Sequence, residues 1–118
     1  MVVKRSERLV SSEIVEFLKV LQCSVYSTEQ GYRKDRGGTR MTPGLADLVV
    51  FGPVGSQLPL FFIEVKAPRA KKKLRESQAQ FAEECRLRDI PWLCAEDVRE
   101  VFDWLVEWGV ITAKREGE

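Results

Sequence analysis

The stretch "LFFIEVKAPRAKKK", from Leu60 to Lys73, is the most informative part of this 118-residue sequence for the fold. Its first half is as apolar as a strand that is covered on both faces of a sheet. Glu64 and Lys66 interrupt that run, and a buried charge is costly unless it has a partner or binds a metal. Because side chains alternate along a strand, these two point to one face and Val65 points to the other. We therefore expect a central strand that carries a functional site.

The composition indicates one globular domain over residues 1–118, with 44% hydrophobic and 31% charged residues. No apolar run is long enough to span a membrane, and the first residues lack the apolar core of a signal peptide. We expect no membrane partner. The expected location is the cytoplasm, or the host-cell cytoplasm if the protein is viral. The sequence has no histidine and no paired CxxC spacing, which argues against zinc sites, Ser-His-Asp hydrolases and histidine-dependent nucleases. Acid–base and metal chemistry would then depend on carboxylates and lysines.

Apolar periodicity and turn residues predict the order helix, three strands, helix, strand, helix. The helices are expected over 7–21, 74–87 and 96–109, and the strands over 23–30, 46–52, 58–67 and 90–95. The second and third strands are joined by a short turn, so they should be antiparallel. The helix before the last strand should form a right-handed crossover. This order predicts an α/β fold in which a mixed sheet of about four strands is flanked by helices.

Asp47 begins the strand that precedes the central one. If the two strands are neighbours, Asp47 lies beside Glu64, and two adjacent carboxylates repel each other unless a divalent cation lies between them. A site made of oxygen ligands favours Mg²⁺ or Mn²⁺ over Zn²⁺. Lys66 next to such a site could orient a water molecule and stabilise charge on a phosphate. This combination is typical of metal-assisted phosphodiester hydrolysis.

Two motifs and one further residue resemble a known family. The motifs are Gly44-Leu45-Ala46-Asp47 and Ile63-Glu64-Val65-Lys66, and Gln78 follows on the next predicted helix. The pattern is similar to that of the PD-(D/E)XK nuclease superfamily and, within it, the virus-type replication-repair nuclease (VRR-NUC) family. The resemblance covers nearly the whole chain and implies a restriction-endonuclease-like fold. One departure is Ala46, where the family has a proline that shapes the turn and binds nothing.

The resemblance also implies a role for each of these residues. It implies that Asp47 and Glu64 bind Mg²⁺ together with the Val65 carbonyl, with Mn²⁺ able to substitute. Lys66 would be the catalytic lysine, and Gln78 would support the site. Taken singly, each feature has a simpler explanation: a surface ion pair for the Glu-x-Lys motif, a turn residue for Asp47 and a solvent-facing helix position for Gln78.

A glutamate on the first helix often completes the metal site of this family. Glu7 fits that place best by its spacing from Leu18, and Glu13 is the second choice. Both lie close to the apolar stripe of the predicted helix, so either side chain can point inward. The sequence leaves this choice open.

Basic residues are concentrated in two predicted loops, although the net charge of the chain is only +1. A locally basic face suits an anionic polymer, and phosphate contacts would fix the position of DNA without reading its sequence. The expected DNA-binding residues are Arg33, Lys34, Arg36, Arg40, Arg69, Lys71, Lys72 and Lys73. The alternative is that these side chains only keep the loops in solvent.

The last predicted helix and the residues after it are more apolar than one small domain requires. The residues concerned are Phe102, Trp104, Trp108 and Val110. Core packing and a homodimer interface both explain them. The resemblance favours a homodimer, because two active sites about a two-fold axis would match the symmetry of a four-way junction.

The sequence therefore predicts an Mg²⁺-dependent endonuclease that acts on branched or junction DNA, similar to a Holliday-junction resolvase. A flap or general nuclease is the nearest alternative, and a restriction-type enzyme is disfavoured because the chain has no room for a separate target-recognition domain. A different class is a nucleic-acid-binding adaptor that keeps the fold without catalysis. The presence of Asp47, Glu64 and Lys66 together argues against the adaptor.

Overall fold

The computed structural model describes residues 6–28, 44–68 and 72–112. Its elements are α1 (Glu7–Val20), β1 (Ser24–Ser27), β2 (Leu48–Phe51), β3 (Phe61–Val65), α2 (Glu76–Leu87), β4 (Trp92–Ala95) and α3 (Val98–Glu107). Their order is the predicted one, and each element lies within its predicted range. The expected α/β fold, with four strands flanked by helices, is confirmed.

The four strands form one mixed sheet in the order β1-β2-β3-β4. β1 pairs with β2 and β2 with β3 in antiparallel orientation, whereas β3 and β4 are parallel. The parallel pair needs a long connection, and α2 provides it. Within the β2–β3 ladder Leu48 pairs with Ile63, so Asp47, one residue earlier, falls opposite Glu64. The strand pairing thus brings together the two carboxylates that the sequence analysis singled out.

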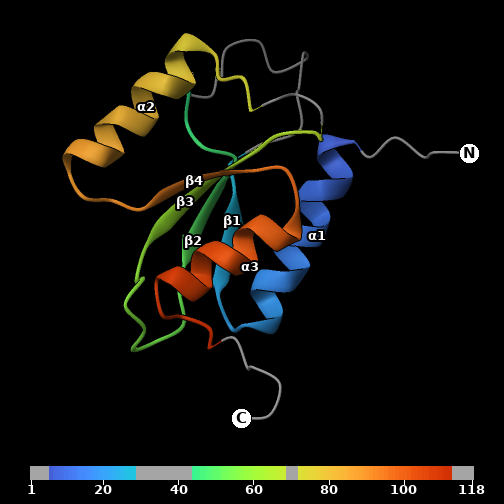
Figure 1. The fold of residues 1–118 in the computed structure, drawn as a ribbon, viewed down its shortest axis with the longest axis vertical. Coiled ribbons are helices and arrows are strands. Elements are labelled where there is room, and N and C mark those ends of the chain that lie inside the picture. The colour runs from blue at the N-terminus through green and yellow to red at the C-terminus, as the bar shows by residue number, and fades with distance from the viewer. Residues whose placement is uncertain (1–5, 29–43, 69–71, 113–118) are drawn as a thin grey trace, which may run out of the picture.

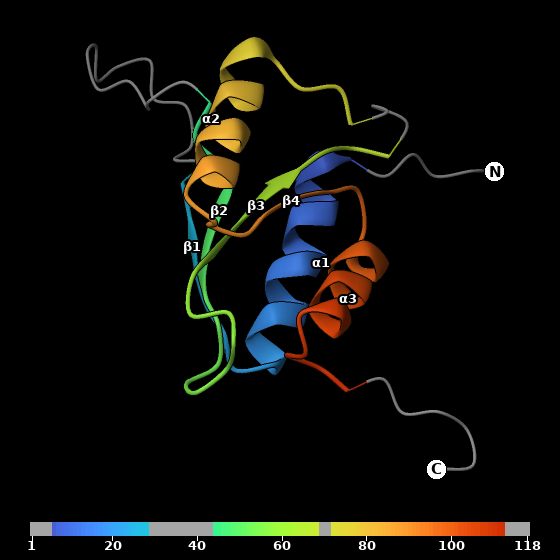
Figure 2. The same cartoon turned by 60° about the vertical axis from the view of Figure 1, so that its left-hand side comes forward.

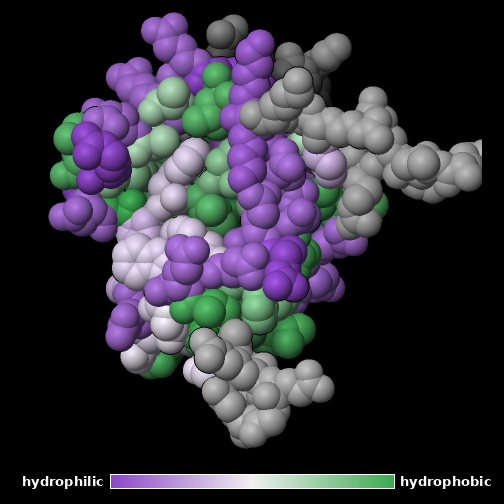
Figure 3. Space-filling model, viewed as in Figure 1, coloured by the Kyte–Doolittle hydropathy of each residue, from purple (hydrophilic) through white to green (hydrophobic). Residues whose placement is uncertain are grey.

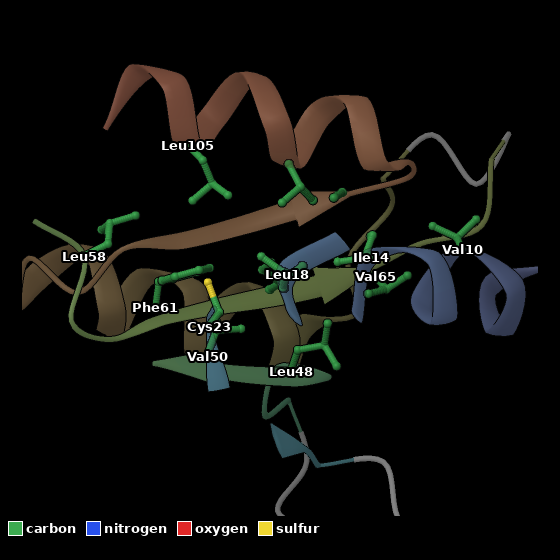
Figure 4. Packing of buried hydrophobic residues seen from close by; sticks show 13 residues of the cluster. Val10, Ile14, Leu18, Cys23, Leu48, Val50, Leu58, Phe61, Val65 and Leu105 are labelled. Carbon is green, nitrogen blue, oxygen red and sulfur yellow. The ribbon is translucent and has the colours of Figure 1, made fainter. Parts of the chain in front are cut away.

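Helices cover the two faces of the sheet unequally. α1 and α3 lie together on one face, and α2 lies on the other (Figures 1 and 2). The hydrophobic core fills the space between the sheet and the α1–α3 pair (Figure 4). Phe61, Ile63 and Val65 of β3 point into this core and are at most 1% exposed. Val10, Ile14 and Leu18 of α1 pack against them at helical spacing.

The opposite face of β3 carries Phe62 and Glu64. Phe62 meets Phe81 of α2 edge-to-face, with ring centroids 5.1 Å apart, which is a favourable geometry for two aromatic rings. This contact fixes α2 over the β3–β4 side of the sheet. The charged residues of the central strand therefore lie in the layer between the sheet and α2.

The aromatic residues of α3 are used mainly for internal packing. The Trp104 ring packs at a tilt against Phe61 and edge-on against Trp108, with ring centroids 5.3 and 6.1 Å apart. Trp108 remains 38% exposed. Core packing accounts for most of the apolar character of this segment, and a homodimer stays a prediction. Hydrophilic side chains cover much of the surface on this side of the molecule (Figure 3). No helix within the described ranges is long and apolar enough to cross a membrane.

Candidate active site

The turn before β2 fixes the position of Asp47. Gly44 has a φ of +87°, and a Cβ there would lie 2.2 Å from the carbonyl oxygen of Ser77 at the start of α2. Only glycine allows both this conformation and this close approach. From the other side, the Thr28 hydroxyl donates to the Ala46 carbonyl (2.5 Å), and the Thr28 N–H donates to the Asp47 carbonyl (2.9 Å). Asp47 is thus held between the end of β1 and the start of α2.

The Asp47 and Glu64 carboxylates lie close together, as the sequence analysis expected. Asp47 Oδ2 accepts a hydrogen bond of 2.8 Å from the Val65 N–H, and Glu64 is only 2% exposed. Burial, followed by the negative charge of Asp47 and a hydrogen bond with it, raises the pKa of Glu64 from 4.5 to about 8, against an opposing effect of Lys66. The pair therefore carries excess negative charge that a proton or a cation would relieve.

Gln78 connects the acidic and basic parts of the site. Its Nε2 donates to Glu64 Oε2 at 2.9 Å, and its Oε1 accepts from Lys66 Nζ at 3.0 Å. Lys66 Nζ itself lies 3.9 Å from Glu64 Oε2. Gln78 and Lys66 are each 9% exposed, which excludes a solvent-facing glutamine and a surface ion pair. The predicted residues thus form one buried network.

A helix cap fixes the orientation of the Gln78 side chain. Arg75 precedes α2, and its N–H donates to Gln78 Oε1 at 2.9 Å. The first N–H groups of a helix lack partners inside the helix, and a glutamine three positions into it can satisfy one of them. Because Oε1 also accepts from Lys66, the amide must direct its NH₂ group to Glu64. Sequence reasoning missed the part played by Arg75, although the spacing of a capping glutamine was the available signal.

The residues of this network fit the donor set for a hard divalent cation. Asp47 Oδ2 accepts from the Val65 N–H and Glu64 Oε2 accepts from Gln78 Nε2. The two carboxylates also hydrogen-bond to each other, and the negative charge of Asp47 contributes to the raised pKa of Glu64. Oxygen ligands of this kind suit Mg²⁺ and Mn²⁺.

The acidic residue expected from the first helix is not among the preassembled ligands. Within 6–28, 44–68 and 72–112 no three acidic, cysteine or histidine side chains are grouped for metal binding. Glu7, an exposed residue at the start of α1, adds its negative charge to the causes that raise the pKa of Glu64. The choice between Glu7 and Glu13 as a further acidic ligand stays a prediction.

Cys94 is a further neighbour of the site, and no motif in the sequence had indicated it. It pairs with Glu64 in the parallel ladder of β3 and β4, so both side chains lie on the α2 face of the sheet. Burial and, second, the charge of Glu64 raise the pKa of the Cys94 thiol to about 11. A neutral thiol thus forms one wall of the site. The pairing register, which the sequence did not provide, was needed to find it.

The structure tests only part of the basic surface. Lys72 and Lys73 are exposed, and the ammonium group of Lys72 bonds to the carboxylate of Glu100 on α3, which raises the pKa of Lys72. Lys72, which lies in the loop after β3, is therefore already paired with an acidic residue of α3. The other expected DNA-binding residues lie outside the described residues: Arg33, Lys34, Arg36, Arg40, Arg69 and Lys71.

Comparison with known proteins supports the fold. No family model and no curated protein matches the chain. Among solved structures, the chain matches one described as a "VRR_NUC domain", with a TM-score of 0.60 and 24% sequence identity, over 87% of this chain and 97% of that chain. The match spans nearly all of both chains. The protein therefore has the fold of a VRR_NUC domain.

Proposed function

We propose that this protein is a divalent-metal-dependent nuclease that hydrolyses phosphodiester bonds in DNA. The observation that carries the proposal is the buried network of Glu64, Gln78 and Lys66, with the partly exposed Asp47 beside Glu64. A binding protein has no need for a carboxylate whose burial raises its pKa to about 8 next to a buried lysine. The fold shared with a VRR_NUC domain agrees with this function.

Asp47, Glu64 and the Val65 carbonyl would hold Mg²⁺, with Glu7 as the additional acidic ligand and Mn²⁺ able to substitute. When bound, the ion polarises the phosphoryl group and lowers the pKa of an attacking water. Gln78 positions Lys66, because its Oε1 accepts a hydrogen bond of 3.0 Å from Lys66 Nζ. Lys66 in turn orients the water and stabilises the negative charge that builds up on the phosphate oxygens.

The finer assignment is a structure-selective endonuclease acting on branched or junction DNA, similar to a Holliday-junction resolvase, as a homodimer. The basic residues of the two predicted loops would contact phosphates and set the position of the DNA. Lys73, exposed and close to the start of α2, belongs to this group. Lys72 contributes less, because Glu100 already pairs with it.

A gel assay tests this proposal. Labelled four-way junction, flap, single-stranded and linear duplex DNA would each be incubated with the protein, with and without Mg²⁺. We expect cleavage only with Mg²⁺ and faster cleavage of the junction than of the linear duplex. Equal rates on all four substrates would support the alternative of a general nuclease. Tight binding without cleavage under any metal condition would instead support the non-catalytic adaptor.

A further inference from the structure

Two aromatic side chains lie exposed and in contact on the outer half of the sheet. Tyr26 of β1 and Phe51 of β2 are 55% and 46% exposed. Their ring centroids are 5.4 Å apart, and the rings meet edge-to-face at 64°. Single exposed apolar residues are common on protein surfaces, but two that hold each other in a defined geometry form a shaped aromatic surface.

The aromatic pair of Tyr26 and Phe51 lies on the same face of the sheet as the candidate active site. Tyr26 pairs with Val49, and alternation along β2 places Asp47, Val49 and Phe51 on one face. Val49 is two residues after Asp47, and two residues of a strand span about 7 Å. Tyr26, the partner of Val49, therefore lies about one such step along the sheet from Asp47. Among the described elements α2 contacts β4, and it contacts neither β1 nor β2. The exposed aromatic pair and the partly exposed Asp47 thus lie on one face of the same two strands.

The two strands that carry the aromatic pair, and the turn after β2, contain no charged residue. Residues 24–28 and 48–57 contain neither an acidic nor a basic residue, in a chain with 19 basic and 18 acidic residues. A phosphate backbone that approaches Asp47 along this surface would therefore meet no further carboxylate from these segments. Lys73, an exposed residue that follows β3, provides positive charge elsewhere on the described surface.

The size of the aromatic pair fits nucleobases better than a second copy of the chain. An aromatic side chain presents about 150–250 Å² of surface, so two rings at about half exposure offer roughly 200 Å². A stable protein–protein interface takes about 800 Å² from each partner. A surface of roughly 200 Å² is instead matched to stacking of one or two bases.

We propose that Tyr26 and Phe51 form a stacking surface for unpaired nucleobases of the DNA strand that enters the active site. This inference rests on the proposed nuclease function and narrows its substrate class. Bases inside a duplex expose their edges and not their faces, so only unpaired bases can stack on the two rings. The substrate would then carry unpaired nucleotides close to the scissile phosphate, as at a branch point, a flap or a frayed end.

Binding without metal tests this proposal separately from cleavage. The probe is a short single-stranded oligothymidylate with one 2-aminopurine, in EDTA, and a labelled duplex of equal length is measured beside it. The variants are Tyr26→Ala and Phe51→Ala, with Tyr26→Phe to retain the ring. Leu87→Ala, at a position 61% exposed on α2, is the matched control. Circular dichroism and thermal melts check that each variant is folded.

We expect each alanine substitution to weaken single-strand binding by roughly 5- to 150-fold, because stacking contributes that much per base. Duplex binding should change by less than about twofold, and Tyr26→Phe and Leu87→Ala should bind like the wild type. The 2-aminopurine fluorescence should be quenched by the wild type and not by a variant that lacks both rings. This result would support the proposal even if the protein cut no DNA, in which case only the nuclease function would fail.

Three results would overturn the proposal. The first is no single-strand binding by the wild type, or binding that the alanine variants retain in full. The second is an equal loss on single strand and duplex, which would indicate a general effect on the fold or the charge. The third is a wild-type dimer in sedimentation velocity that Tyr26→Ala converts to a monomer, which would assign the aromatic pair to a second copy. Cleavage that persists together with any of these leaves the nuclease function intact.

Discussion

The metal-free protein should lose stability as the pH rises from 4.5 towards 8, and Glu64→Gln should remove most of that loss. The pKa of Glu64 is raised from 4.5 to about 8 in the folded chain by burial and by Asp47. The folded state then binds a proton that the unfolded state has already released. A group with a raised folded-state pKa stabilises the fold fully below its unfolded pKa, and this stabilisation disappears as the pH rises through the folded value.

The size of the effect follows from the two pKa values, about 8 and 4.5. One pKa unit corresponds to about 1.4 kcal/mol at 25 °C, so the free energy of unfolding should fall by at most about 5 kcal/mol across this range. That is a large part of the roughly 10 kcal/mol that is typical of the stability of a whole domain. Bound Mg²⁺ should reduce the loss, because the cation replaces the proton between the two carboxylates.

Urea unfolding followed by tryptophan fluorescence measures this effect at about pH 5 and about pH 8, in EDTA and in Mg²⁺. Glu64→Gln keeps an acceptor for Gln78 without the charge. Glu16→Gln, at an exposed position of α1, is the matched control and should behave like the wild type. If Glu64→Gln and the wild type lose stability in parallel between the two pH values, Glu64 is not the buried, protonated group described above.

Three further predictions concern the rest of the site. Lys66→Ala should lower turnover by orders of magnitude while Mg²⁺ binding in calorimetry stays close to that of the wild type, because the lysine acts on the transition state; loss of metal binding would make its role structural. Gln78→Ala should cost about 1–3 kcal/mol in urea unfolding, because Lys66 Nζ and the Arg75 N–H lose their acceptor, and unchanged stability would argue against the bridging role. Lys73→Ala should lower the slope of log affinity against log salt by about 0.9 in DNA-binding titrations. Lys72→Ala should lower it less, because Glu100 already pairs with that lysine; equal effects would contradict the pairing.

Much of the fold and the centre of the site could be predicted from the sequence. Alternation along one strand placed Glu64 and Lys66 on the same face, and the short turn before that strand made β2 and β3 antiparallel neighbours. These two local facts led to the expectation that Asp47 lies beside Glu64, and the register, in which Leu48 pairs with Ile63, confirms it. Both depend on strand geometry alone, which a sequence encodes directly.

Other features depend on tertiary packing that no local pattern specifies. The predicted third strand began at Leu58, which is fully buried although it precedes β3, since an apolar turn can pack on the core without joining the ladder. Cys94 lies beside Glu64 only because β4 pairs with β3 in that register. The bond between Lys72 and Glu100 joins a loop to α3 across 28 residues. The cluster of basic residues predicted that Lys72 would be available to contact DNA phosphates, whereas Lys72 is paired with the carboxylate of Glu100.

The central claim is that Asp47 and Glu64 form a metal-dependent site for phosphodiester hydrolysis, and one Mg²⁺ titration of cleavage tests it most directly. Wild type, Asp47→Asn and Asp103→Asn would be compared on a labelled four-way junction. Asparagine at position 47 keeps an acceptor for the Val65 N–H, and Asp103 is an exposed residue of α3 that pairs with Arg99. We predict Mg²⁺-dependent cleavage by the wild type and by Asp103→Asn, and none by a folded Asp47→Asn. Wild-type rates from Asp47→Asn, or full cleavage by the wild type without metal, would contradict the account.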